Sequence, residues 1–462
     1  MTRGIAPGPR GHLLLGMLPV VRRNALQTLH QAAMQFGDVV RMRFGVVTAH
    51  MISGPEGVQH VLVENSKNYG KQTRGFLKLR EILGNGLLTA EGESWRRHRR
   101  IAQPAFHRQR LAAFADTMVR EVDRTAERWS ELAALGEPVD VAREMARLTL
   151  QIIGRTMLSR DVALEADRVG GALTYLLHAV NLRTSRLLDL PQSLPTPGNL
   201  RFARALRTLD GVVQQIIAER RRATERPEDL LSMLLENSDE ETGQSMSDAQ
   251  LRDEAMTIFL AGHETTANAL TWTFYLLSRH PSLGRALRLE LERELTGNPS
   301  FSQLPGLTLT RAVIEEGLRL YPPAWLISRS VIEDDEIGGY HIPAGSIVFV
   351  SPFIVHRDAR IWENPEGFDP ERFAPERAAS VPRGAYFPFG AGPRQCIGAS
   401  FALMEAQLVL ATLWRRFRLD LVPGHPVEPE PSITLRARHG MSMTVHRWPD
   451  PPVGPDTPRA GR

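Results

Sequence analysis

Long proline-free stretches with helical spacing of apolar residues constrain the fold most strongly. In residues 108–132 and 199–223, apolar side chains recur every three or four positions and no proline interrupts them. The chain favours helix from about 93 to 320, whereas 39–53 and 328–352 contain short β-branched runs separated by glycine and proline. We therefore expect a mostly α-helical fold with a small β region.

Composition gives no reason to divide the chain into independent units. We expect one domain over residues 1–446 and a disordered, proline-rich tail over 447–462. No apolar run approaches the ~20 residues that span a bilayer; the nearest, 13–21, is broken by Gly16 and Pro19. The net charge of +4 is small for 462 residues. We expect a cytoplasmic monomer with no integral membrane anchor and no nucleic-acid partner.

The only cysteine, Cys396, lies in the segment FPFGAGPRQCIG. A single cysteine excludes an intramolecular disulfide and any metal site built from several thiols of this chain. It can be a small buried apolar residue, a nucleophile or a metal ligand. Gly390 and Gly392 permit a sharp turn, Arg394 adds positive charge, and a helical pattern follows the cysteine. The start of a helix stabilises a thiolate, so this setting favours an anionic sulfur that acts as a ligand.

This segment resembles the haem-binding loop of the cytochrome P450 family. The family pattern F-x-x-G-x-R-x-C-x-G is matched by Phe389, Gly392, Arg394, Cys396 and Gly398. The resemblance implies that haem b is bound with the Cys396 thiolate as axial iron ligand. It also implies that Phe389, Gly390 and Gly398 lie beside the cofactor.

A second motif, FLAGHETTANAL, lies within a helical pattern from about 247 to 279. Gly262 inside a helix costs ~1 kcal/mol relative to alanine, and Glu264 is costly to bury without partners; a groove over a haem would explain both. The segment resembles the family's oxygen-binding motif. That resemblance implies that Ala261 contacts the cofactor, that Thr265 hydrogen-bonds dioxygen and that Glu264 relays protons. Back-bonding of the hydroxyls within a buried helix is the alternative interpretation.

Two further motifs resemble the family in content and order. Glu316 and Arg319 stand three residues apart in a helical pattern, and the resemblance joins them to Arg372 in a structural trio that supports the haem loop. The basic stretch WRRHRR contains a W-x-x-x-R pattern. By resemblance, the haem propionates would be bound by Trp95, Arg99, Arg329 and Arg394, with His356 as a further contact.

The resemblance covers essentially the whole chain up to about His446. It implies a triangular helical prism whose long central oxygen-binding helix faces the cysteine-bearing helix across the haem. The implied reaction inserts one atom of O2 into a hydrophobic substrate. We expect no fused reductase, so electrons from NAD(P)H would arrive through a separate ferredoxin and ferredoxin reductase. Arg97, Arg100 and Arg383 are our predicted docking face for the acidic ferredoxin.

The substrate pocket is predicted by resemblance from apolar residues in several segments. The predicted lining residues are Phe76, Leu87, Leu177, Phe259, Trp325, Leu326 and Ile327. We expect a long-chain fatty acid or a terpenoid as substrate, with a macrocyclic metabolite as a weaker third.

Three other functions compete with this interpretation. A peroxide-driven peroxygenase has the same fold, but the Glu264–Thr265 pair suits proton delivery to bound oxygen. A haem-binding sensor would not explain the presence of the Glu264–Thr265 pair. A cofactor-free thiol enzyme would need a base beside Cys396, and no pattern in the sequence supplies one.

Overall fold

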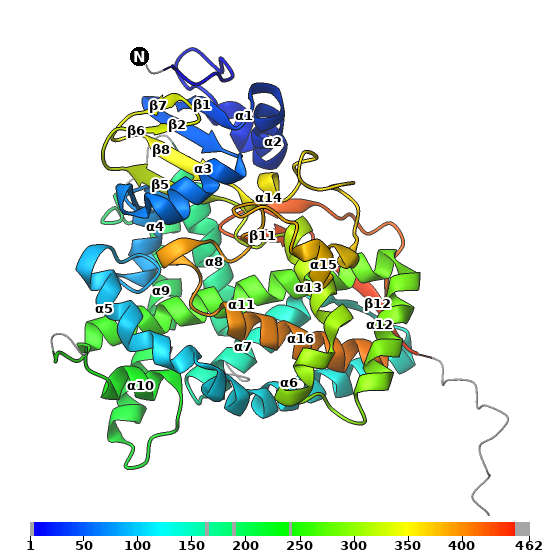
Figure 1. Ribbon diagram of the computed structural model, residues 1–462. Helices are drawn as coiled ribbons and strands as arrows, with labels where there is room; N and C mark the ends of the chain where they lie inside the picture. Colours follow the sequence, from blue (N-terminus) through cyan, green and yellow to red (C-terminus); the bar gives the residue numbers. More distant parts are fainter. Residues whose placement is uncertain (1–3, 162–165, 187–190, 240–242, 449–462) are drawn as a thin grey trace, which may run out of the picture.

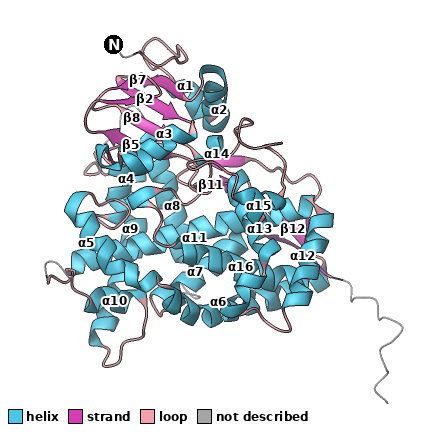
Figure 2. Cartoon of the chain, viewed as in Figure 1, coloured by secondary structure: helices cyan, strands magenta, loops and turns pink. Residues whose placement is uncertain are grey.

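Helices make up most of the described chain, as the sequence predicts (Figure 2). The computed structural model describes residues 4–161, 166–186, 191–239 and 243–448. The helices are α1 (Leu18–Arg23), α2 (Ala25–Phe36), α3 (Pro55–Gln59), α4 (Arg74–Leu83), α5 (Gly92–Ala102), α6 (Arg108–Leu135), α7 (Val141–Met157), α8 (Ala166–Ser185), α9 (Pro197–Arg222), α10 (Leu230–Glu236), α11 (Asp248–Arg279), α12 (Pro281–Glu294), α13 (Thr308–Leu320), α14 (Pro352–Val355), α15 (Pro375–Ala378) and α16 (Ala399–Arg416). In this part of the chain, no helix is both long and apolar enough to cross a membrane.

The strands form one five-stranded sheet and three smaller sheets. The large sheet has the order β1-β2-β8-β5-β3, and its antiparallel β1–β2 pair lies in the β-branched stretch 39–53. The other sheets are β4-β12-β9, β10-β11 and β6-β7. The bounds are β1 (Val39–Phe44), β2 (Val47–Ile52), β3 (Tyr69–Gly70), β4 (Pro138–Asp140), β5 (Ile327–Val331), β6 (Asp335–Ile337), β7 (Tyr340–Ile342), β8 (Ile347–Val350), β9 (Phe417–Leu421), β10 (Pro429–Pro431), β11 (Leu435–Ala437) and β12 (Ser442–Arg447).

The longest helix, α11, runs through the middle of the helical body (Figure 1). Its start is fixed by a capping box, in which the Ser247 hydroxyl accepts from the Gln250 N–H and the Gln250 side chain accepts from the Ser247 N–H. It packs against α7, α9, α13 and α16. The central position of α11 explains why its sequence is apolar around most of its circumference.

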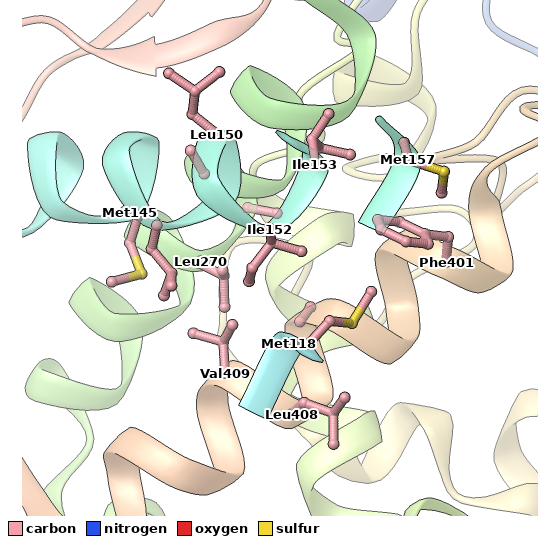
Figure 3. Packing of buried hydrophobic residues seen from close by; sticks show 14 of the residues in the cluster. Met118, Met145, Leu150, Ile152, Ile153, Met157, Leu270, Phe401, Leu408 and Val409 are labelled. Carbon is pink, nitrogen blue, oxygen red and sulfur yellow. The ribbon is translucent and has the colours of Figure 1, made fainter. Parts of the chain in front are cut away.

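The core between these helices combines aliphatic, sulfur-containing and aromatic side chains (Figure 3). Met118 of α6, Ile152 of α7, Leu270 of α11 and Leu408 of α16 are all fully buried there. Burial of each such side chain contributes ~1.5–3 kcal/mol. This packing holds α11 and α16, which follows Cys396, in fixed relative positions.

Gly262 has a packing role that differs from the predicted one. A Cβ atom at this position would lie 2.5 Å from Cδ1 of Ile153 in α7. The glycine therefore permits close approach of α7 and α11, and the prediction that a haem groove explains Gly262 is wrong.

Residues 447 and 448 do not belong to a disordered tail, contrary to the prediction for 447–462. Arg447 belongs to β12, where it pairs with Phe417 of β9. The Trp448 indole donates a hydrogen bond to the Trp414 carbonyl at 2.7 Å. Residues 449–462 lie outside the described part of the chain.

The contact between Gly262 and Ile153 can be tested by substitution. Gly262→Ala should lower the urea midpoint, because overpacking costs ~1–3 kcal/mol and exceeds the gain of ~1 kcal/mol in helix propensity. Ile153→Ala in the same chain should remove most of that additional loss in a double-mutant cycle.

Gly211→Ala in α9 is the matched control, because no atom lies within 4 Å of a Cβ atom there. It should be neutral or stabilising. Equal midpoints for Gly262→Ala and Gly211→Ala would contradict the packing role of Gly262.

Candidate cofactor and oxygen site

The Cys396 loop is held by backbone contacts on both sides. The Cys396 N–H donates to the Phe389 carbonyl at 2.9 Å, and the Gly390 N–H donates to the Phe387 carbonyl at 2.9 Å. Gly392 has φ +67°, and a Cβ atom there would overlap the Leu62 carbonyl. Gly392 therefore serves close packing of this loop against the chain at Leu62.

The Cys396 side chain is accessible to solvent, although it lies deep in the protein. Ala261, in the middle of α11, is exposed as well. Exposure of these positions inside the helical body indicates open space next to both the cysteine loop and α11.

Burial raises the pKa of the Cys396 thiol, and the Gly398 N–H and the Arg99 guanidinium only partly oppose this effect. Gly398 is the N-cap of α16, so Cys396 lies two residues before the N-cap. The helix start therefore does not by itself offset the burial of the sulfur. A cation bound to the sulfur would favour the thiolate.

A buried ionic network supports the loop, and it consists of the three predicted residues. Arg319 binds Glu316 through two hydrogen bonds of 2.7 Å, and both side chains are fully buried. Arg372 lies 3.4 Å from the same carboxylate. The Arg319 guanidinium also donates to the carbonyls of His356 and Pro365 at 2.7 Å and of Gly367 at 2.9 Å. The trio thus fixes the irregular chain that leads to the cysteine loop.

His356 has a different place from the predicted propionate contact. Its ring is fully buried, and its Nε2 accepts the Phe387 N–H at 3.0 Å. It therefore faces no open space and connects the network at Arg319 to the first residue of the cysteine loop. Burial lowers the pKa of His356 well below its usual range, so the ring is neutral and Nε2 can accept.

Positive charge accumulates beside the cysteine loop. Arg329 of β5 is mostly buried, and burial lowers its pKa to about 10. Burial also lowers the pKa of Arg394 to about 10, with Arg329 adding repulsion. Lys71 was not predicted from the sequence; it is buried, and burial with repulsion from Arg329 and Arg394 lowers its pKa strongly. The Glu91 carboxylate partly opposes the lowering of all three pKa values.

The remaining predicted cofactor residues of α5 also lie at this cluster. The Arg394 guanidinium stacks 3.9 Å from the centre of the Trp95 ring. Arg99 donates to the Gln395 carbonyl at 2.7 Å, directly next to Cys396. Trp95, Arg99, Arg329 and Arg394 are therefore brought together, and only Lys71 escaped the sequence analysis.

These residues fit a haem. Buried cations with too little compensating charge need an anionic partner, and a haem carries two carboxylates. Among the described residues, no group of three or more His, Cys, Asp or Glu side chains could hold a metal ion. A metal bound through Cys396 would therefore have to bring further ligands with it, as haem iron does. A Cβ atom at Gly398 would meet no protein atom closer than 3.6 Å, so the protein itself does not require glycine there.

The two polar residues of the α11 motif differ in their contacts. The Thr265 hydroxyl donates to the Ala261 carbonyl at 2.7 Å, which is the back-bonding alternative. Glu264 instead accepts a hydrogen bond of 2.8 Å from Thr434, a contact that the sequence does not predict. Thr434 in turn accepts from the Asn268 amide at 3.1 Å. Burial raises the pKa of Glu264, and Thr434 and Arg436 oppose the rise.

The predicted pocket residues divide into two groups. Leu177, Phe259 and Trp325 are buried, so these three side chains present little surface to open space. Leu177 and Phe259 belong to the core between the helices, where apolar residues at helical spacing usually pack, and Trp325 belongs to a second buried cluster. The residues that remain partly exposed are Phe76, Leu87, Leu326 and Ile327.

The predicted docking arginines are mostly engaged within the protein. Arg97 donates to the Gln244 side chain and to the Ser245 carbonyl, both at 3.1 Å. Arg100 binds the Asp239 carboxylate. Of the predicted face, only Arg383 is exposed, and Arg97 and Arg100 are half-buried; the docking face itself stays a prediction.

Comparison with known proteins agrees with this arrangement. The sequence profile of the family described as Cytochrome P450 matches residues 6–442. Cyclooctatin synthase of Streptomyces melanosporofaciens is 38% identical over 94% of this chain and 93% of its own. Cyclooctat-9-en-7-ol 5-monooxygenase of the same organism is 38% identical over 92% and 91%. Pentalenene oxygenase of Streptomyces avermitilis is 38% identical over 85% and 86%. The chain thus belongs to the cytochrome P450 family of haem-thiolate enzymes.

Proposed function

We propose that this protein is a monooxygenase that hydroxylates a hydrophobic terpenoid. The observation that carries the proposal is the accessible Cys396 beside a buried cation cluster, together with the Glu264–Thr434 contact on α11. The names of three relatives at 38% identity denote terpenoid substrates, which supports this class over a fatty acid.

Cys396 would provide the axial ligand of the haem, and Lys71, Trp95, Arg99, Arg329 and Arg394 would hold its carboxylates. The bound haem would supply the activation of dioxygen that is typical of the family. Because the cations are fixed by carbonyls and rings of this chain, they are oriented before the cofactor arrives.

Proton delivery would fall to Glu264. Its raised pKa keeps a larger protonated fraction near neutral pH than an ordinary carboxylic acid has. The Thr434 hydroxyl donates a hydrogen bond to Oε1 of this carboxyl. The Thr265 hydroxyl can present its lone pairs to a proton donor while it donates to the Ala261 carbonyl.

The overall reaction consumes the substrate C–H bond, one O2, two electrons and two protons, and yields an alcohol and one water. We further propose that the electrons come from NAD(P)H through a separate ferredoxin and ferredoxin reductase. Exposed Arg383 remains a candidate contact for that partner.

Isotope labelling tests the reaction directly. Under 18O2, with NADPH, a ferredoxin and its reductase, purified protein should convert a cyclic terpene such as pentalenene to an alcohol carrying one 18O atom. A parallel incubation with a long-chain fatty acid should give little product. Turnover with hydrogen peroxide alone, and none with NADPH, would establish the peroxygenase instead; no turnover of any terpene would contradict the substrate class.

The role of Glu264 predicts a characteristic pH dependence. Coupled product formation should fall as the pH rises through the raised pKa of Glu264, because the protonated form is lost. Glu264→Gln should lower the rate about 10²-fold and flatten this profile. Thr434→Val removes a contact that lowers the pKa, so it should shift the profile to higher pH.

Thr271→Val is the matched control. Thr271 is buried in the same helix, and its hydroxyl donates to the Ala267 carbonyl. This variant should keep the wild-type profile. An identical profile in Thr434→Val and wild type would show that Glu264 does not set the pH dependence.

A further inference from the structure

A buried histidine–glutamate pair joins α5 to α11. Nδ1 of His98 lies 2.8 Å from Oε1 of Glu254, and the two side chains are 0% and 2% exposed. His98 directly precedes Arg99, and Glu254 lies about three turns before Glu264. Burying polar side chains costs free energy, so the position of this pair requires an explanation.

The second oxygen of Glu254 holds the chain between α4 and α5. Oε2 accepts the Leu87 N–H at 3.1 Å. The two preceding residues of α11 make equivalent contacts: Asp253 accepts the Asn85 N–H at 2.7 Å, and Arg252 donates to the Ile82 carbonyl at 2.8 Å. Three consecutive charged side chains of α11 therefore hold the backbone of residues 82–87.

The glycines of this segment allow it to lie directly on α11. A Cβ atom at Gly84 would overlap the Asp253 carboxylate, and one at Gly86 would overlap the Thr257 hydroxyl. Gly84 also has φ +57°, which favours glycine. Residues 84–87 are thus each held against α11.

The other end of the same segment holds the cations. The Leu88 carbonyl accepts from Lys71 Nζ at 2.5 Å, and the Thr89 carbonyl accepts from Arg80 at 2.8 Å. The Ala90 carbonyl accepts from Arg394 at 2.8 Å. Three successive carbonyls therefore orient three cations, two of which belong to the proposed carboxylate site.

We propose that His98 and Glu254 are positioning residues for the cofactor. His98 contacts Glu254, and Glu254 binds the Leu87 N–H directly before the carbonyls that orient Lys71 and Arg394. The inference rests on the proposed haem site, and it extends that site to charges that do not touch the cofactor. A role in folding alone would instead affect only the stability of the protein.

Haem loss from the holoenzyme separates these two roles. The rate of haem transfer to excess apomyoglobin is measured well below the melting temperature. Glu254→Ala and His98→Ala should each raise that rate about tenfold or more, the size of effect typical of residues that orient ligands.

The matched control is Asp229→Ala, which removes the carboxylate of another buried pair, Arg220–Asp229, with side chains 7% and 2% exposed. This pair connects α9 to the N-cap of α10, and within the described part of the chain it makes no hydrogen bond or ion pair with residues 84–90. Asp229→Ala should lower the melting temperature while leaving the rate of haem loss unchanged.

The double variant His98→Gln with Glu254→Gln replaces the pair by amide side chains that can still hydrogen-bond. It should regain most of the haem retention that the alanine variants lose. Haem loss at the wild-type rate in Glu254→Ala would overturn the inference. If Glu254→Ala does not fold, haem loss at the wild-type rate in His98→Ala would overturn it. A wild-type protein without a thiolate-ligated haem spectrum would overturn the proposed function itself, so the two failures are distinguishable.

Discussion

The cysteine loop depends on the contacts of the Arg319 guanidinium. This group pairs with Glu316 where both side chains are fully buried, and it donates to three backbone carbonyls of the irregular segment 356–367. Removing one partner would leave a buried charge unpaired, at a cost of about 3–5 kcal/mol. Through His356, this network reaches Phe387 and so sets where Cys396 lies.

An excess of positive charge beside the cysteine loop organises the candidate cofactor site. Burial lowers the pKa values of Lys71, Arg329 and Arg394, and repulsion from neighbouring cations lowers those of Lys71 and Arg394 further. Such a cluster is unfavourable in isolation and becomes favourable when carboxylates enter it. The cluster, the accessible thiol and α11 therefore form one unit whose electrostatics suit an anionic, metal-bearing cofactor.

The sequence was sufficient for features that depend on local pattern. The helical pattern over about 247–279 predicted α11, and the spacing of Glu316 and Arg319 predicted their pairing. It was insufficient where contacts join distant segments. The contact of Gly262 with Ile153, the support of Phe387 by His356 and the bond from Thr434 to Glu264 all depend on tertiary packing. Lys71 escaped notice because a lone lysine in a loop carries no motif.

The spectrum of the reduced protein with carbon monoxide tests the central claim most directly. If Cys396 is the axial ligand of a haem, the complex should show a strongly red-shifted Soret band, and Cys396→Ser should abolish that shift. An unshifted Soret band in freshly purified wild-type protein, or a shifted band that persists in Cys396→Ser, would contradict the account.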